Sequence, residues 1–277
     1  MFAKLLKYEW KATGGLLGIL SGAALGVGLA GGFSFRSLIV ASQSIGDDSA
    51  NALVMAPLAF FLMFAFLALV VYAFAVQIIL LSRFYKSRFT DEGYLTFTLP
   101  VSTWQNYLSA LSNILIWSVI SGLVVTVSVV IIILLGASGV PVLDGAQVME
   151  GFTESYQAAF VEEGYAKYMA VSLLYNFVSV FSAPVLLMTC ITLGAVLAKK
   201  HKVLAAIGVY YAISMAIGMI SSVSSAVMLA GDTGILMSEY YAAATAAAGW
   251  QILVQIAVCV GGSILSVWLM DKKLNLP

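Results

Sequence analysis

The run from Ala52 to Leu81 contains no charged side chain and consists almost entirely of apolar residues. At 1.5 Å per residue, a helix of this length reaches about 45 Å, whereas the hydrocarbon core of a bilayer is about 30 Å thick. Such a helix must either tilt strongly or extend its last turns beyond the membrane. Only 9% of the chain is charged, and soluble domains carry about 25% charged residues. We therefore predict an all-α integral membrane protein.

Apolar runs of this kind recur along the chain and predict about six spans within a single transmembrane domain, 1–277. The predicted spans are Gly14–Phe33, Ala52–Leu81, Thr103–Leu135, Met169–Ala198, Val203–Ala230 and Gly249–Met270. Ser102 and Gln105 form a capping box that marks the start of the third span. Pro184 is expected to kink the fourth.

The segment 1–13 is predicted to be an amphipathic helix that lies in the membrane interface. Its aromatic and apolar residues recur every four positions, and its lysines fall on the opposite face. That pattern is typical of an interfacial helix. The alternative is the basic start of a signal peptide, which the length of the following apolar run disfavours.

Four glycines at strict four-residue spacing, Gly14, Gly18, Gly22 and Gly26, form one stripe on the first predicted span. Small residues let helices approach closely in lipid, where packing drives association. The stripe therefore predicts a packing face. It serves either as a subunit interface or sliding surface, or as a static contact with another span of the same chain.

The polar connections of the chain differ in charge. With both termini on the cytoplasmic side, 11 of the 13 Lys and Arg residues are cytoplasmic and nine of the 13 Asp and Glu residues are on the outer side. The cytoplasmic excess of basic residues fixes orientation. The outer side then holds a polar loop at 34–51, an acidic segment at 136–168 and a third connection that begins at residue 231. We expect short helices at 148–160 and at 238–248, the latter re-entrant or on the surface.

Motifs for chemistry are missing from the sequence. It contains neither a G-x-x-x-x-G-K-[ST] phosphate-binding loop nor a G-x-S-x-G nucleophile elbow, and His201 is the single histidine. We therefore expect no enzyme, no catalytic residue, no metal site and no cofactor bound by this chain. The apolar interiors of the spans hold no ionisable acid, base or histidine of the kind that coupled carriers use. Their amides, such as Gln77 and Gln255, either line a path or join helices.

The segment 82–102 is the longest polar and aromatic interruption on the cytoplasmic side. Thr90 is placed to cap a short helix whose first turn holds Asp91 and Glu92. Other side chains of the segment offer contact area to a partner protein, and some place charge at the rim of that contact. These are Tyr94, Leu95 and Phe97 for the contact, and Arg83, Lys86 and Arg88 for the rim. The other interpretation is an interfacial helix with its aromatic rings among lipid headgroups.

Two stretches carry a family resemblance, one between the second and third predicted spans and one at the start of the chain. The segments 83–86 and 91–102, with the sequence D-E-G-Y-L-T-F-T-L-P-V-S in the second, resemble bacterial permease subunits of type-2 ATP-binding-cassette (ABC) transporters, and 4–11 is similar to the opening of those permeases. The resemblance implies a cytoplasmic coupling helix between spans two and three. It also implies two copies of a cytosolic ATPase that holds ATP and Mg, and a second permease subunit, identical or different.

The sequence and the resemblance together predict the permease subunit of an ATP-driven exporter in the bacterial cytoplasmic membrane. Apolar walls favour a hydrophobic or amphipathic substrate, such as a drug, a lipid or an antimicrobial peptide. The lipid bilayer is the other expected partner, and no nucleic acid is expected. Two alternatives stay open: a self-contained channel or secondary carrier, and a membrane scaffold or sensor that does not transport.

Overall fold

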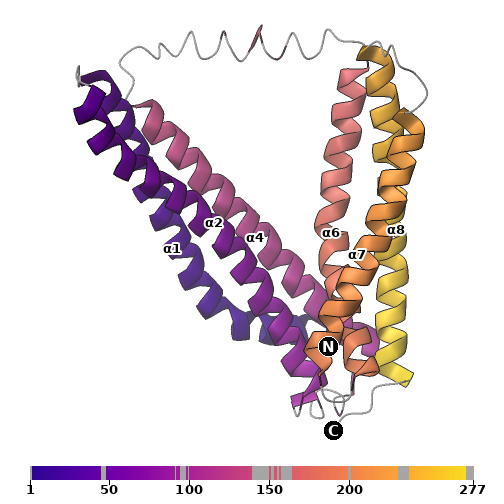
Figure 1. The fold of residues 1–277 in the computed structure, drawn as a ribbon. Helices are drawn as coiled ribbons and strands as arrows, with labels where there is room; N and C mark the ends of the chain where they lie inside the picture. The colour runs from indigo at the N-terminus through magenta and orange to yellow at the C-terminus, as the bar shows by residue number, and fades with distance from the viewer. Residues whose placement is uncertain are drawn as a thin grey trace. The chain divides into compact units, whose positions relative to one another are not determined.

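The structure is a computed structural model, and its described residues are helical along most of their length (Figure 1). It describes residues 2–44, 48–90, 92–93, 98, 100–138, 150, 153–154, 156, 164–198, 201–229 and 237–272. The main helices are α1 (Phe2–Ser44), α2 (Asp48–Phe89), α4 (Thr103–Ala137), α6 (Tyr165–Leu197), α7 (Lys202–Leu229) and α8 (Met237–Lys272). No strand occurs in these ranges.

Six of these helices are long and apolar enough to cross a membrane. The prediction of an all-α, multi-pass membrane protein with about six spans is confirmed to that extent. The third, fourth and fifth predicted spans match α4, α6 and α7 to within a few residues. Most of the acidic segment 136–168, including most of its predicted helix, lies outside the described residues.

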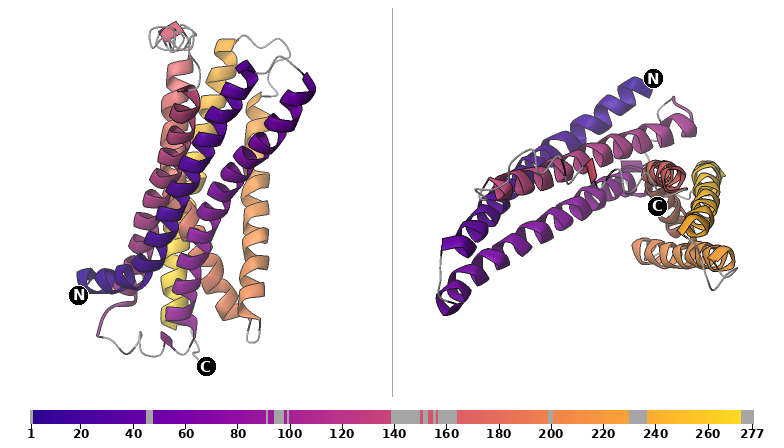
Figure 2. Two further views of the ribbon diagram at one scale, coloured as in Figure 1. Left: turned by 90° about the vertical axis from the view of Figure 1, so that its left-hand side faces the viewer. Right: turned by 90° about the horizontal axis from the view of Figure 1, so that it is seen from above.

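Helix α1 corrects two predicted boundaries. The interfacial helix at 1–13 and the first span are one continuous helix, which also runs on through much of the predicted loop at 34–51. The N-terminal turns of α1 are nevertheless angled away from the rest of the helix (Figure 2). Thr13 donates hydrogen bonds to the carbonyl oxygens of Glu9 (3.1 Å) and Trp10 (3.4 Å). Such back-bonding, followed directly by Gly14 and Gly15, weakens a helix against bending.

Helices α2 and α8 are also longer than the predicted spans. Helix α2 continues beyond the apolar run to Phe89, so its last turns include Arg83 and Lys86. Helix α8 begins at Met237, so the alanine-rich segment 238–248 is helical as expected but is the first part of the sixth span. The prediction of a separate re-entrant or surface helix there is wrong, because Gly249 lies inside a continuous helix and does not end it.

The chain divides into two compact units. The first contains residues 81–111 and 150–277 with the first two residues of the chain, and thus α6, α7, α8, the end of α2 and the start of α4. The second contains 3–80 and 112–149, and thus most of α1 and α2 and the greater part of α4.

Close packing in the second unit depends on glycines near the end of α1. A Cβ added to Gly28 would lie 2.8 Å from the Cβ of Ser128 on α4, and one added to Gly31 would lie 2.8 Å from that of Ala65 on α2. These positions are too tight for a side chain. Stacked rings of Trp10 and Trp117, with centroids 4.8 Å apart, join the other end of α1 to α4.

Small and hydroxyl residues likewise hold the first unit together. A Cβ on Gly194 of α6 would overlap the backbone of Ala206 on α7. Ser266 of α8 donates a hydrogen bond to Thr189 of α6 (3.0 Å), and Ser182 donates to Gln255. In lipid, helices associate through such packing and hydrogen bonds, so these contacts define the α6–α7–α8 bundle.

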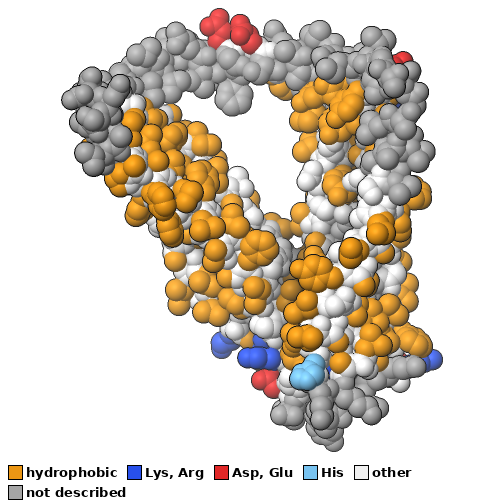
Figure 3. Space-filling view, in the orientation of Figure 1, with side chains coloured by type: hydrophobic (Ala, Val, Ile, Leu, Met, Phe, Trp, Pro, Cys, Tyr) orange, Lys and Arg blue, Asp and Glu red, His pale blue; other side chains and the backbone are white. Residues whose placement is uncertain are grey.

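The surface matches a membrane environment. On the face that Figure 3 shows, hydrophobic side chains cover the lengths of the helices, and no described Lys, Arg, Asp or Glu side chain is seen along those lengths. On α2 the exposed residues include large rings such as Phe60, Phe64 and Phe74. Exposed apolar area on this scale is costly in water and favourable in lipid.

Candidate functional site

The segment 82–102 does not form one separate element. Its first eight residues are the last turns of α2, and its last residue directly precedes α4. The predicted contact residues Tyr94, Leu95 and Phe97, together with Asp91, lie outside the described residues. Arg83, Lys86, Arg88 and Glu92 are described, and the prediction for this group can be compared with their surroundings.

Arg88 is buried, with 1% of its surface exposed. Its Nη2 donates to the side-chain oxygen of Asn106 (2.8 Å) and to the carbonyl oxygen of the same residue (2.9 Å). Its Nη1 donates to Ser87 Oγ (2.6 Å). The guanidinium carbon lies 5.1 Å from the ring centroid of Phe84, a cation–π distance. Arg88 therefore ties the end of α2 to the start of α4, and its predicted role as an exposed rim charge is wrong.

A third helix contributes to the same place. Lys202, the first residue of α7, donates from Nζ to the carbonyl oxygen of Phe89 (3.3 Å). That carbonyl is at the C-terminus of α2, where helix carbonyls have no partner in their own helix and positive charge is favourable. The ring of Phe89 packs edge-on against Phe84, with centroids 5.7 Å apart. We call these residues, Phe84, Ser87, Arg88, Phe89, Asn106 and Lys202, the Arg88 cluster.

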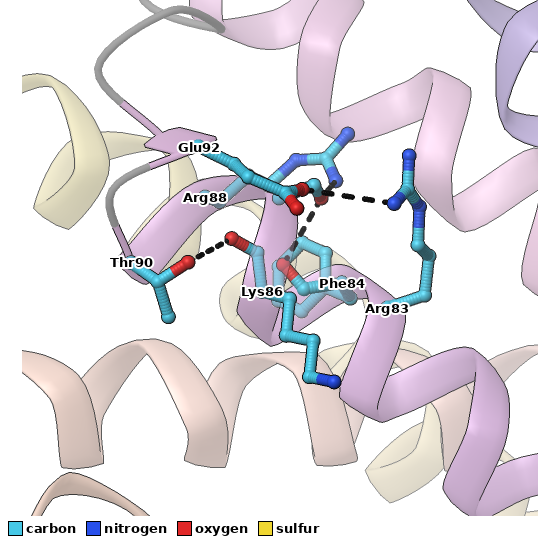
Figure 4. A network of polar contacts seen from close by, with 7 residues as sticks. Arg83, Phe84, Lys86, Arg88, Thr90 and Glu92 are labelled. Carbon is cyan, nitrogen blue, oxygen red and sulfur yellow. Dashed lines mark hydrogen bonds and ion pairs between the residues drawn. The ribbon is translucent and has the colours of Figure 1, made fainter.

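The chain beyond α2 leaves this cluster through a short turn (Figure 4). The Thr90 hydroxyl donates to the carbonyl oxygen of Lys86 (2.5 Å), and the amide of Gly93 donates to the carbonyl oxygen of Thr90 (2.8 Å). The Thr90 side chain thus closes α2, while its backbone starts the helical turn at 92–93. Glu92 lies 3.6 Å from Arg83, in an ion pair whose side chains are both partly exposed. Lys86 is exposed and points away from this pair.

The start of α4 is fixed on its other side by α8. The amide of Gln105 donates to Ser102 Oγ (3.3 Å), which confirms Ser102 as the N-cap. The Thr103 hydroxyl donates to the carboxylate of Asp271 near the end of α8 (3.2 Å). One turn further along, the Tyr107 hydroxyl donates to Ser263 of α8 (3.4 Å).

The arrangement ties the ends of several helices together. The two ends of the connecting segment 90–102 are held about a buried, multiply bonded guanidinium, and α7 and α8 are attached to the same helix ends. Among the residues that the structure describes, no group of three His, Cys, Asp or Glu side chains is placed to hold a metal ion. A load on the segment would act on four helix ends together.

The glycine stripe of α1 lies apart from the packed glycines. Gly18, Gly22 and Gly26 are exposed, and a Cβ added to any of them would meet nothing within 4 Å among the described residues. Gly14 differs, because its added Cβ would lie 3.8 Å from the rings of Trp10 and Trp117. At the three exposed positions, no static contact with the described residues of the second unit is therefore found. A role in subunit packing stays a prediction.

Two of the amides within the spans join helices. Gln77 of α2 donates to Ser118 of α4 (2.9 Å), and Gln255 of α8 accepts from Ser182 of α6. The sequence left open whether such amides line a path or join helices. Gln77 and Gln255 both fit the second interpretation.

Sequence reasoning missed Asn106, Lys202 and Asp271 as partners of the segment, because each is distant from it along the chain or lies in a different helix. A comparison of this chain with protein-family models, curated proteins and solved structures gave no match.

Proposed function

We propose that this chain is the membrane-spanning permease subunit of an ATP-driven ABC transporter, most consistent with an exporter, in the bacterial cytoplasmic membrane. The observation that carries the proposal is the Arg88 cluster. It lies where the family-like segment 91–102 joins α2 and α4, and it links those helix ends to α7. Force applied to that segment by a partner has a bonded route into the membrane helices.

The proposed partner is a cytosolic ATPase present in two copies, which holds the ATP and Mg. A second permease subunit, identical or different, completes the transporter. The segment 91–102 acts as the coupling helix, and Arg83, Lys86 and Glu92 are the described charges at its rim. Arg88 is buried and positions the segment; it makes no contact with the partner. The stripe Gly18–Gly26 is the proposed packing face for the second permease.

The substrate proposed here is hydrophobic or amphipathic. Exposed rings and aliphatic side chains cover the spans, and the polar groups on them are few and largely occupied by hydrogen bonds within their own helix or between helices. A hydrophilic solute would find few groups to replace its hydration. A drug-like amphiphile, a lipid or an antimicrobial peptide needs fewer polar groups to replace its hydration.

Affinity purification of the chain from its native membrane tests the proposal. We expect a nucleotide-binding chain to co-purify and the complex to hydrolyse ATP. Loss of the partner from the Tyr94→Ala, Phe97→Ala double variant is expected, with normal membrane insertion. Tyr211→Ala is the matched control, since Tyr211 is an exposed aromatic residue of α7, and it should keep the partner.

The alternatives give different results in the same preparation. Transport by the purified chain in liposomes without any ATPase would replace the proposal with a channel or secondary carrier. A complex that contains no nucleotide-binding chain and moves no substrate would indicate a scaffold or sensor.

A further inference from the structure

A cavity lies between the start of α4 and the end of α8, outside the Arg88 cluster. Its volume is about 610 Å³, and the residues that define its chemistry are Thr103, Trp104, Ile264, Val267, Trp268 and Asp271. All of them belong to the first compact unit. Cavities that hold small molecules in proteins are typically about 300–1,000 Å³, so the space suffices for a headgroup or for part of an amphiphile.

Helix periodicity brings the α8 side chains of this cavity onto one face. Ile264 and Trp268 are four residues apart, as are Val267 and Asp271, and residues at this spacing are neighbours on a helix surface. Val267 is 5% exposed, whereas Trp268 and Trp104 are 44% and 43% exposed. The cavity thus combines a buried aliphatic side chain, two accessible indole rings and one carboxylate.

We propose that this cavity binds the ammonium group of an amphiphile, with the cation at Asp271 and the indole rings of Trp104 and Trp268. Trp is the best aromatic partner for a cation, and quaternary ammonium groups are recognised by aromatic rings in this way. The carboxylate disfavours anionic groups. The apolar remainder of the ligand lies along Ile264, which is 54% exposed on the lipid-facing length of α8.

The charge of Asp271 has a local cost that supports a role in binding. Asp271 lies in the last turn of α8, where a negative charge is unfavourable to the dipole of its own helix. Its hydrogen bond from Thr103 places it near the N-terminus of α4, which offsets that cost in part. An uncharged acceptor would keep the bond from Thr103 without the cost. The hydrogen bond from Thr103 therefore needs only an acceptor oxygen at position 271. The negative charge of Asp271 is not needed for that bond, and it would attract a bound cation.

A bare metal ion is a poorer fit than an ammonium group. The described lining supplies one carboxylate and the two hydroxyl groups of Ser102 and Thr103, whereas hard divalent ions take six or more oxygen ligands. The ammonium group itself has two sources, a phospholipid headgroup and a free amphipathic cation. Both present the same chemistry to the cavity. The inference concerns binding only, so it holds or fails independently of any ATPase partner.

The test uses the purified full-length chain in maltoside micelles, which contain no ammonium group. Equilibrium dialysis with radiolabelled dodecyltrimethylammonium is expected to show saturable binding, weakened about tenfold or more by Asp271→Asn or by Trp268→Leu. Glu239→Gln, which removes an acidic charge at the other end of α8, should leave the binding unchanged. Dodecyl sulfate is expected to show no saturable binding.

Native mass spectrometry then separates the two sources. Retention of phosphatidylcholine over phosphatidylglycerol by the wild-type chain, lost in Asp271→Asn, would assign the site to a lipid headgroup. Saturable dodecyltrimethylammonium binding without lipid preference would assign it to free amphipathic cations. Equal binding of the cation by the wild-type chain and by both variants would overturn the proposal, as would equal binding of dodecyl sulfate. Circular dichroism shows whether each variant is folded. If Asp271→Asn does not fold, the binding measured with Trp268→Leu tests the proposal.

Discussion

Replacement of Asn106 by Ala tests whether the buried guanidinium of Arg88 depends on its neighbour in α4. The substitution removes one of the two acceptors on Asn106, the side-chain oxygen at 2.8 Å, and leaves the carbonyl oxygen in place. A hydrogen bond to a charged group contributes about 1.5–3 kcal/mol to stability. Because Arg88 is 1% exposed, water cannot readily replace the lost acceptor. We therefore expect the free energy of unfolding to fall by about 2–3 kcal/mol.

A double-mutant cycle with Arg88→Met isolates this interaction. Met fills much of the same volume without charge, so Asn106→Ala should cost about 1 kcal/mol or less in that background. The expected coupling free energy, which is the difference between these two costs, is about 1–3 kcal/mol. The assay is reversible unfolding in mixed micelles with increasing dodecyl sulfate, followed by tryptophan fluorescence and by helical circular dichroism.

Asn113→Ala is the matched control for this cycle. Asn113 is another buried asparagine of α4, but its side chain donates to the neutral hydroxyl of Thr13 at 3.4 Å. Its coupling to Arg88→Met should be zero within the usual error of additivity, about 0.5 kcal/mol. A coupling free energy below that limit for Asn106 itself would refute the argument. The guanidinium would then be held by its other contacts, and the link from α2 to α4 would carry little energy.

Two further predictions concern glycines. Gly194→Val should lower the unfolding free energy by more than about 2 kcal/mol, because the side chain would overlap the backbone of Ala206; Gly208→Val, in open space on α7, should cost little, and equal losses for both would contradict the α6–α7 contact. Gly22→Leu should leave the stability of the isolated chain unchanged but weaken association with the proposed second permease, measured by energy transfer between labelled subunits in liposomes; unchanged association would remove the stripe from that proposed interface.

At the end of α2, the burial of Arg88 could be predicted from the sequence, but its hydrogen-bond acceptor could not. Tyr72, Val76, Leu80, Phe84 and Arg88 recur every four residues, and all five are buried. A stripe continued at this spacing predicts a buried Arg88, but a positive residue beyond an apolar run is ordinarily read as exposed charge. The identity of its acceptor could not be predicted, because Asn106 belongs to the next helix and the turn between them sets the register.

The bounds of α1 and α8 differ from the predicted bounds for another physical reason. Polar residues after an apolar run do not end a helix when tertiary packing supports its continuation. A Cβ added to Gly136 of α4 would overlap the ring of Phe35, so that part of α1 is held by contact with a helix about a hundred residues away in the chain. The sequence predicts a boundary at Gly249, yet a glycine inside a helix costs only about 1 kcal/mol relative to alanine. The packing of the neighbouring turns of α8 can offset a cost of that size.

Spacing predicted the glycine stripe but not its environment. Gly22 and Gly28 lie on the same helix, and only Gly28 faces a neighbour closely enough to exclude a side chain. The difference is rotational: six residues along a helix turn the side-chain direction by about 600°, which is 240° beyond a full turn. A four-residue repeat identifies a face, and the neighbouring helices decide whether that face is inside or outside. Helix periodicity thus predicted six spans well and predicted their contacts poorly.

The buried guanidinium is the feature that best relates this fold to the proposed transport function. A buried charge is costly, and an apolar residue of similar volume is often as stable or more stable. The gain is geometric, because Arg88 reaches both acceptors of Asn106 only when the end of α2 and the start of α4 lie in one particular register. A coupling element needs that property, because a partner's movement is transmitted only if the helix ends cannot slip past each other. The cluster supplies it at the point where the proposed coupling segment joins the membrane helices.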